Sequence, residues 1–245
     1  NMQSLVIINI KFHFLCRISV HISATKRSIR SSVIVSAESR PLWMPGTSAP
    51  SHLKGTLPGD YGFDPLNLGE DSKDLDWYVQ AELQHARWAM LGVAGMAAPE
   101  LLTKLGVSDL PNWHDAPFYN GYFASATTIF TVQMFMMNWA EIRRWQDIKN
   151  PGSVSEDPAF SGNKLPVGDV GYPGGIFNPM NYGKKNEELK ALKAKEIANG
   201  RLAMVAALGC FIQYDHTGVG PVENLTSHLS NPSVNNVFKA AFIGF

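Results

Sequence analysis

The sequence has few cysteines, no net charge and too little glycine and proline for a fibrous protein, and each shortage excludes a class of protein. Its two cysteines, Cys16 and Cys210, cannot build a disulfide framework or a four-cysteine zinc site, which argues against a crosslinked secreted protein and a zinc finger. The 21 basic residues are balanced by 21 acidic ones, so the chain lacks the positive charge of a dedicated nucleic-acid binder. With 21 glycines and 15 prolines in 245 residues, it is neither fibrous nor wholly disordered.

Acidic residues are absent from residues 1–37, whereas five basic residues and seven serines lie there. A basic, serine-rich leader without acidic residues is typical of an organelle transit peptide. A secretory signal is the alternative, because residues 5–16 are more apolar than most transit peptides. We expect cleavage near Ala37 or Glu38 to remove residues 1–37. The remaining chain has 16 basic and 21 acidic residues and a net charge of −5.

Three later segments could cross a membrane. Residues 116–140 contain no charged residue, and this run exceeds the roughly 20 residues that a helix needs to span a bilayer. Residues 77–105 and 196–214 are also apolar and rich in small residues, but each contains Glu and Arg. A soluble helical bundle would explain these charges as an exposed stripe, so the hydropathy pattern leaves both architectures open.

The two charged segments repeat one pattern. In each, a potential ligand lies three positions after Glu, Arg lies five positions after it, and Ala-Met follows. The loops that precede the two segments, GFDPLN at 62–67 and IFNPMN at 176–181, are also similar. Two copies of a loop and helix on either side of an unrelated helix indicate a pair related by pseudo-two-fold symmetry. The repeated residues are Glu82, His85 and Arg87 in the first copy and Glu196, Asn199 and Arg201 in the second.

Helix geometry predicts how these charges pair. Residues five apart on a helix lie about 140° apart around its axis, so each Glu is poorly placed to pair with the Arg of its own helix. Two crossing helices satisfy both charges reciprocally, with Glu82 paired to Arg201 and Glu196 to Arg87. We expect small residues to allow the close approach of the two backbones that such a crossing requires, at Gly92, Gly95, Ala203 and Ala207.

Potential metal ligands are spread along all three apolar segments. A single polar residue of this kind is usually a hydrogen-bonded interior group, but seven of them in three short segments favour ligation. Glu, Asn and Gln offer hard oxygens that suit Mg²⁺, and neutral His offers a ring nitrogen. Because they do not converge on one point, they predict separate axial ligands for several flat, metal-bearing cofactors. The seven are Glu82, His85, Gln133, Glu141, Glu196, Asn199 and Gln213.

Five longer motifs resemble those of the chlorophyll a/b-binding light-harvesting proteins of plants and green algae, most closely the members that serve photosystem I. The resemblance extends from about residue 41 to the end of the chain. The motifs are LPGDYGFDP (57–65), AELQHARWAMLG (81–92), EIRRWQDIKNPG (141–152), VGYPGGIFNP (170–179) and KEIANGRLAM (195–204).

The resemblance implies an all-α membrane protein with three transmembrane helices, at about residues 74–105, 121–145 and 187–214. The first and third form the crossed pseudo-two-fold pair, and a short amphipathic helix follows at about 222–230. Residues 38–245 would form one chlorophyll a/b-binding antenna domain.

The resemblance also assigns roles to individual residues. Arg87 and Arg201 fall on the positions of the reciprocal ion pairs, and Arg144 falls on a further pairing position three residues after Glu141. The loops around Asp64 and Asn178 resemble those that hold the ends of two crossed xanthophylls. The positions of the chlorophyll magnesium ligands are Glu82, His85, Gln133, Glu141, Glu196, Asn199, Gln213 and His228. His228 enters through the resemblance alone, because its own surroundings in the sequence predict a solvated residue.

The implied function is light harvesting. The protein would bind chlorophyll a, chlorophyll b, xanthophylls of the lutein and violaxanthin types, β-carotene and lipid, and would pass excitation energy to photosystem I. Its partners would be the photosystem I core, a neighbouring antenna subunit in a heterodimer and the lipid of the chloroplast thylakoid membrane. Residues 143–195 hold nine basic and six acidic residues and residues 100–120 hold one and three, so the positive-inside tendency places the N-terminus in the stroma.

Three other functional classes predict different features. An ion or proton carrier also keeps Glu and Arg in the membrane, but its ligands line one continuous path. A photoprotective protein that releases excitation as heat shares the two repeated helices. An enzyme is not expected, because Cys210 and the remaining histidines have no matched catalytic partners.

One position departs from part of the family. The most far-red photosystem I antenna members have Asn where this chain has His85, which argues against strongly red-shifted emission here. The stretch QDIKNP (146–151) nevertheless looks like those members, so the antenna subtype stays open between two photosystem I types.

Overall fold

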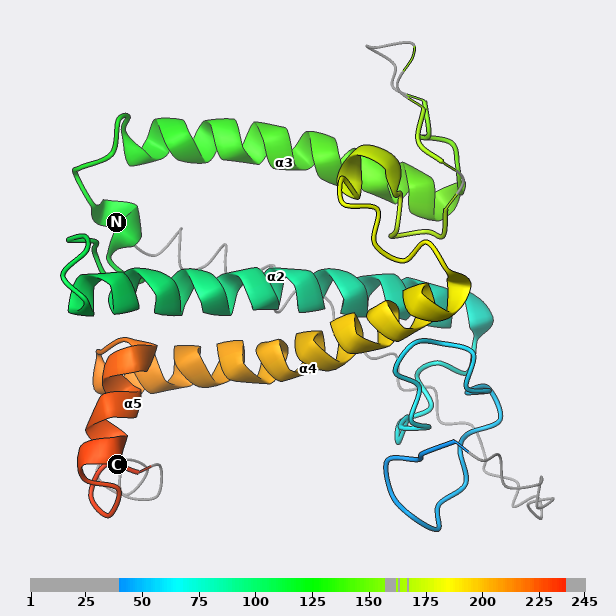
Figure 1. The fold of residues 1–245 in the computed structure, drawn as a ribbon, viewed down its shortest axis with the longest axis horizontal. Coiled ribbons are helices and arrows are strands. Elements are labelled where there is room, and N and C mark those ends of the chain that lie inside the picture. Colours follow the sequence, from blue (N-terminus) through cyan, green and yellow to red (C-terminus); the bar gives the residue numbers. More distant parts are fainter. Residues whose placement is uncertain (1–39, 157–161, 163, 167, 237–245) are drawn as a thin grey trace, which may run out of the picture. The chain divides into compact units, whose positions relative to one another are not determined.

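The computed structural model describes residues 40–156, 162, 164–166 and 168–236, and these residues are helical apart from loops and one isolated β-bridge (Figure 1). The predicted all-α class is therefore confirmed for the described residues. The proposed leader at 1–37 lies outside them. The elements are α2 (Ser72–Lys104), the 3-10 helix η1 (Ala116–Phe118), α3 (Ala126–Lys149), the 3-10 helix η2 (Gly175–Phe177), α4 (Asn186–Thr217) and α5 (Pro221–Ser230).

Helices α2 and α4 pack side by side and carry most of the buried residues (Figure 1). Leu83 and Ala86 are buried on α2, and Ile197 and Gly200 are buried on α4. Leu83 and Ile197 occupy equivalent positions in the two copies of the repeat, as do Ala86 and Gly200. The internal repeat therefore extends to burial, since equivalent residues of both copies are buried, and one equivalent pair, Ala86 and Gly200, meets in the interface.

The closest approach of the two helices is at Ala86 and Gly200. A Cβ atom added to Gly200 would collide with the Cβ of Ala86 and would lie 3.2 Å from its Cα, so glycine is needed there. The prediction that Gly92 and Gly95 allow the close approach is wrong, because both are exposed and no atom lies within 4 Å of a Cβ built on either. Ala203 and Ala207, from the same prediction, are only half-buried.

Helix α3 begins later than the uncharged run that predicted it. Ser125 caps its N-terminus by accepting a hydrogen bond from the backbone N–H of Thr128, and residues 119–125 lie outside any helix. The uncharged part of α3 is thus residues 126–140, which is about 22 Å long at 1.5 Å per residue. Among the helices in the described part of the chain, α4, with 32 residues and a hydropathy of 1.2, is the one that qualifies as a candidate membrane span by length and composition.

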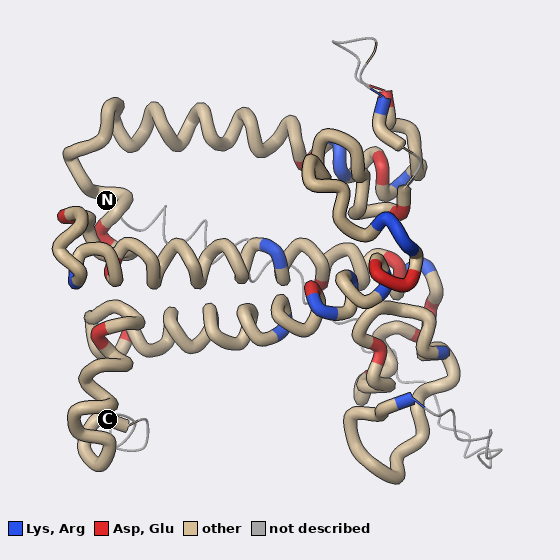
Figure 2. Tube along the Cα trace, in the orientation of Figure 1, with Lys and Arg blue, Asp and Glu red and all other residues tan. Residues whose placement is uncertain are grey.

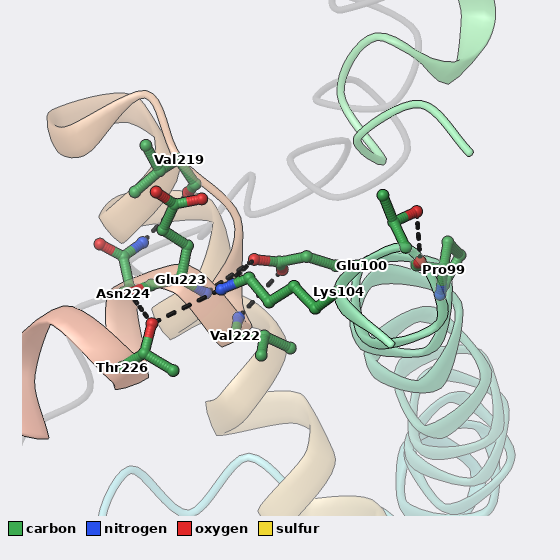
Figure 3. A network of polar contacts seen from close by, with 9 residues as sticks. Pro99, Glu100, Lys104, Val219, Val222, Glu223, Asn224 and Thr226 are labelled. Atoms are coloured by element: carbon green, nitrogen blue, oxygen red, sulfur yellow. Dashed lines mark hydrogen bonds and ion pairs between the residues drawn. The ribbon is translucent and has the colours of Figure 1, made fainter. Parts of the chain in front are cut away.

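Helix α5 is attached to the C-terminal end of α2 by Glu100 (Figure 3). The Glu100 carboxylate accepts hydrogen bonds from the backbone N–H groups of Val222, at 3.0 Å, and Glu223, at 2.7 Å. These N–H groups belong to the first turn of α5 and have no partner within that helix. The ammonium of Lys104 lies 3.7 Å from the same carboxylate and 3.5 Å from the hydroxyl of Thr226. A side chain of α2 therefore caps α5 and fixes where it starts.

The repeated loops before α2 and α4 fold alike. The Oδ1 atom of Asp64 accepts the backbone N–H of the fourth residue after it, Leu68, at 3.1 Å, and Oδ1 of Asn178 accepts that of Tyr182 at 3.1 Å. In the described part of the chain, Asn67 and Asn181 are the two non-glycine residues with positive φ, at 52° and 51°. Asn tolerates this left-handed conformation better than most residues, so each loop turns into its helix in the same way.

The two loops differ in charge. Asp64 also accepts the N–H of Gly69 and lies 2.9 Å from Nε2 of His52, whereas Asn178 donates its amide to the carbonyl of Tyr182. Burial alone would raise the pKa of Asp64, but the N–H groups of Gly69 and Leu68 and the contact with His52 outweigh it and lower the pKa. Asp64 is therefore held as a carboxylate.

Candidate functional site

Two reciprocal ion pairs join α2 and α4, as the repeat predicts. Nε of Arg201 lies 2.7 Å from Oε1 of Glu82, and Nε of Arg87 lies 2.8 Å from Oε1 of Glu196. Each pair uses the same atoms in the same way, so the pseudo-two-fold relation holds at atomic detail. Because each Glu is neutralised by an Arg of the other helix, it can offer an oxygen to a metal without adding net charge.

Each of these arginines also binds one of the repeated loops. Nη1 of Arg201 donates to the carbonyl of Gly59 at 2.7 Å, and Nη1 of Arg87 donates to that of Gly171 at 3.0 Å. Both glycines have positive φ, and a Cβ on Gly59 would lie 3.0 Å from the side chain of Ile197. These glycines were not among the predicted site residues, although a Gly near the start of both loop motifs is the signal that could have revealed them.

The predicted ligands one turn further along also adopt equivalent conformations. Nδ1 of His85 lies 2.7 Å from the carbonyl oxygen of Ala81, and Nδ2 of Asn199 donates to that of Lys195 at 2.9 Å. In a neutral His85 the proton therefore lies on Nδ1, which leaves the lone pair on Nε2. In Asn199 the hydrogen bond from Nδ2 to the Lys195 carbonyl leaves Oδ1 as the outer atom of the side chain. Both side chains are exposed. Each side chain thus presents one atom that could ligate a metal outward from the helix pair.

The remaining predicted ligands lie on three different helices. On α3, Gln133 is exposed, and Nε of Arg144 donates to Oε2 of Glu141 at 3.0 Å, which is the pairing that the resemblance implies. Gln213 is exposed near the C-terminal end of α4. In the described ranges no three His, Cys, Asp or Glu residues gather closely enough to hold a bare metal ion. These donors therefore suit a metal that brings its other ligands with it.

His228 is held on α5 by the segment that follows this helix. Its Nδ1 lies 2.6 Å from the carbonyl oxygen of Asn235, so a neutral ring keeps its lone pair on Nε2, and the side chain is exposed. The hydrogen bonds of Glu100 to the start of α5 fix the helix that carries this residue. Neither contact has a signal in the sequence around His228, which explains why reasoning from the residues alone missed it.

Tyr172 is a further contact of the site that the sequence analysis did not identify. Its hydroxyl donates to Oε2 of Glu196 at 2.7 Å, on the side of the carboxylate away from Arg87. Burial raises the pKa of Tyr172 most strongly, and the hydrogen bond to the negative Glu196 raises it further, so the phenol stays protonated and remains a donor.

A cavity of about 740 Å³ lies where α2 and α4 meet the first repeated loop and the start of the second. Its wall is mostly apolar, with the two partners of one ion pair and Asp64 among its polar groups. An elongated apolar molecule with a polar end would match this lining. The wall includes Trp43, Phe63, Asp64, Leu68, Glu82 and Arg201.

Taken together, the fold and site define a helical scaffold in which two repeated helices are joined by reciprocal ion pairs and carry exposed His, Asn and Gln side chains. The chain belongs to the chlorophyll A-B binding protein family, whose model matches residues 49–215. The resemblance seen in the sequence motifs is thereby confirmed.

Individual relatives agree with this assignment. The chain is 55% identical over 195 residues to chlorophyll a-b binding protein 4, chloroplastic, of Arabidopsis thaliana, covering 80% of this chain and 76% of that protein. It is 54% identical over 195 residues to chlorophyll a-b binding protein P4, chloroplastic, of Pisum sativum, covering 80% and 75%. It is 51% identical over 203 residues to photosystem I chlorophyll a/b-binding protein 6, chloroplastic, of Arabidopsis thaliana, covering 82% and 75%.

Proposed function

We propose that this protein is a light-harvesting antenna of the chloroplast thylakoid membrane that binds chlorophyll a, chlorophyll b and xanthophylls and transfers excitation energy to photosystem I. The observation that carries the proposal is the duplicated arrangement on α2 and α4, in which an ion-paired Glu is followed one turn later by an outward donor atom. The names of three photosystem I relatives, 51%, 45% and 43% identical to the chain, support the transfer to photosystem I.

The residues fit chlorophyll as a ligand. A chlorophyll supplies the absorption of light and four nitrogens around its magnesium, so it needs one axial donor from the protein. Carboxylate and amide oxygens suit Mg²⁺, and the Nδ1 contacts of His85 and His228 favour the tautomer of a neutral imidazole whose lone pair is on Nε2, the ligating form. We assign the axial positions to Glu82, His85, Gln133, Glu141, Glu196, Asn199, Gln213 and His228.

The spacing of these ligands determines the optical behaviour. Glu82 and His85 are three residues apart on α2, as are Glu196 and Asn199 on α4, and residues so spaced have Cβ atoms roughly 5–6 Å apart. Rings bound to them lie close together and exchange excitation rapidly. The protein thus acts by fixing the distance and orientation of its pigments, which carry the photochemistry themselves.

The repeated loops are the proposed positions for the polar ends of two xanthophylls, of the lutein and violaxanthin types. Asp64 lines the apolar cavity at the first loop, and Asn178 occupies the equivalent position in the second. Bound β-carotene and lipid would fill further apolar surface. The exposed aromatic and aliphatic side chains of α2, α3 and α4, such as Trp88, Phe135 and Leu202, support this use of the surface.

We further propose that α2, α3 and α4 all cross the membrane, with the N-terminus in the stroma. Figure 2 shows an uncharged stretch on each of these helices, at residues 88–99, 126–140 and 202–214. Each is shorter than the roughly 30 Å of hydrocarbon, so Arg and Lys side chains beyond its ends would extend toward the membrane surface. The relatives named chloroplastic support the location, and an antenna heterodimer beside the photosystem I core is the proposed assembly.

The test is to refold residues 38–245 in detergent with chlorophyll a, chlorophyll b and xanthophylls, excite chlorophyll b and record chlorophyll a emission. We expect a coloured, monodisperse band with sensitised emission. A colourless helical protein would refute the proposal and favour an ion carrier, with Glu82, Arg87, Glu196 and Arg201 as its path. A coloured complex whose fluorescence lifetime is strongly shortened would instead indicate a photoprotective protein.

A further inference from the structure

The two ion-paired glutamates differ at one oxygen. Oε2 of Glu196 accepts the hydroxyl of Tyr172 at 2.7 Å. Within the described residues, Oε2 of Glu82 receives no hydrogen bond, although its Oε1 is bound by Arg201 as closely as Oε1 of Glu196 is bound by Arg87. The differences between His85 and Asn199 and between Asp64 and Asn178 are visible in the sequence, whereas the unequal hydrogen bonding of the two glutamates appears only in the structure.

Tyr172 is fixed in place by contacts with its ring. Cζ of Arg87 lies 5.0 Å and Nζ of Lys193 lies 4.3 Å from the ring centroid, and both cations are attracted to the negative face of the phenol ring. Lys193 is in turn paired with Asp169. The hydroxyl is thus held toward Glu196 by the loop and by both helices.

The position equivalent to Tyr172 in the first copy of the loop carries no hydroxyl. Gly59 and Gly171 bind the two arginines in the same way, so the residue equivalent to Tyr172 is Asp60. Asp60 is directed to the N-terminal segment, where it pairs with Arg40 at 2.7 Å and accepts the N–H of Gly55 at 2.7 Å. A carboxylate there could not donate to Glu82 in any case. Tyr172 therefore makes the surroundings of the two glutamates chemically unequal.

We infer that Tyr172 is a positioning residue for the axial ligand Glu196: its hydroxyl fixes the plane of this carboxylate and draws electron density from Oε2, the oxygen that Arg87 leaves for a magnesium. This inference rests on the proposed function, in which Glu82 and Glu196 each bind a chlorophyll. An oxygen that already accepts a hydrogen bond is a weaker donor to a metal than one that does not, and a carboxylate held on both sides rotates less. The chlorophyll on Glu196 is therefore bound to a weaker and more rigid ligand than the chlorophyll on Glu82.

The experiment compares the pigment complex of the full chain with that of Tyr172→Phe, which removes the hydroxyl and keeps the ring between its two cations. Low-temperature absorption is recorded and pigments are counted for both. We expect the same number of chlorophylls and a shift confined to one chlorophyll band. Tyr119→Phe is the matched control, because its hydroxyl has no hydrogen bond among the described residues and its ring contacts Tyr122. It should shift no band.

The shifted band is assigned with Arg87→Leu/Glu196→Leu, which removes the ligand and its partner together. The band that this double variant loses should be the one that Tyr172→Phe shifts. If the double variant loses no chlorophyll, Glu196 is not a ligand and both the assignment and the inference fall. If it loses one chlorophyll but Tyr172→Phe shifts no band, or a different one, the ligand assignment stands and the inference alone is wrong.

A second background covers the case in which the double variant does not form a complex. Glu196→Gln keeps an oxygen at the same place but removes the charge that strengthens the bond from Tyr172. In that background Tyr172→Phe should produce a shift clearly smaller than in the unaltered chain. An equal shift in both backgrounds would show that Tyr172 acts through something other than Glu196 and would overturn the inference.

Discussion

Replacing Gly200 by Ala tests whether α2 and α4 approach each other most closely at Gly200 and Ala86. The added Cβ would collide with the Cβ of Ala86 and lie 3.2 Å from its Cα, and since these atoms are fixed to backbone the helices must separate. Overpacking of this kind costs about 3 kcal/mol at the upper end of the usual range, and the better helix propensity of Ala returns about 1 kcal/mol. The net loss of about 2 kcal/mol corresponds to a fall in Tm of about 4–8 °C for a chain of this size.

The assay is thermal denaturation of the refolded pigment complex, followed by visible circular dichroism. Gly209→Ala is the matched control on the same helix, because no atom lies within 4 Å of a Cβ built there, and its Tm should stay unchanged or rise. Adding Ala86→Gly to Gly200→Ala removes the colliding methyl and should restore part of the lost stability. A Tm of Gly200→Ala equal to that of the control would show that the crossing lies elsewhere.

Four other outcomes are expected. Arg201→Leu leaves Glu82 without its partner and Gly59 without its donor, so the yield of coloured complex should fall more than for His228→Ala; equal yields would contradict the role of the reciprocal pairs. Glu100→Ala removes the acceptor of two N–H groups and should weaken the start of α5 by roughly 1–2 kcal/mol, seen as faster amide hydrogen exchange at Pro221–Ser230 with Ala126–Lys149 unchanged. Burial alone would raise the pKa of Asp60, but the N–H groups of Gly62 and Gly55 and the Arg40 guanidinium hold this pKa below the ordinary 3.8. The carboxylate therefore stabilises the fold above that pH, and its contribution is lost as pH falls through the lowered pKa. Asp60→Asn should flatten the decline of Tm below about pH 4, and an unchanged slope would refute this account. His85→Asn should move the lowest emission band to longer wavelength, and an identical low-temperature fluorescence spectrum would count against His85 as the ligand that limits red emission.

The pairing of charges could be predicted from the sequence because it follows from helix geometry alone. Once Glu82 and Arg87 are seen to repeat as Glu196 and Arg201, the angle between residues five apart leaves the partner helix as the place for each counterion. The structure contains both pairs at 2.7 and 2.8 Å. The equivalent positions of His85 and Asn199 could be predicted from the same repeat, and the structure adds that each binds the carbonyl one turn before it.

Other features could not be predicted because several residues met the same requirement. Small residues occur along both helices, so composition could not select Gly200 over Gly92 as the point of contact. The uncharged run at 116–140 gave no sign that the helix begins at Ala126, because a capping Ser125 is one of several polar residues in that run. The role of Tyr172 depends on a contact between a loop and a helix that no local pattern records.

The hydrogen bond from Arg201 to Gly59 also bears on the order in which the protein can be assembled. The two residues are 142 positions apart, so at a synthesis rate of about 5–20 residues per second roughly 7–28 s separate the appearance of the loop from that of the side chain that holds it. If α2 crosses the membrane as proposed, Glu82 would wait almost as long for its counterion, and an unpaired carboxylate near the hydrocarbon would be costly throughout that time. A chain inserted into the membrane as it is made would therefore pass through a long unstable stage. A chain delivered complete, as the proposed leader at residues 1–37 would arrange, brings both partners to the membrane together.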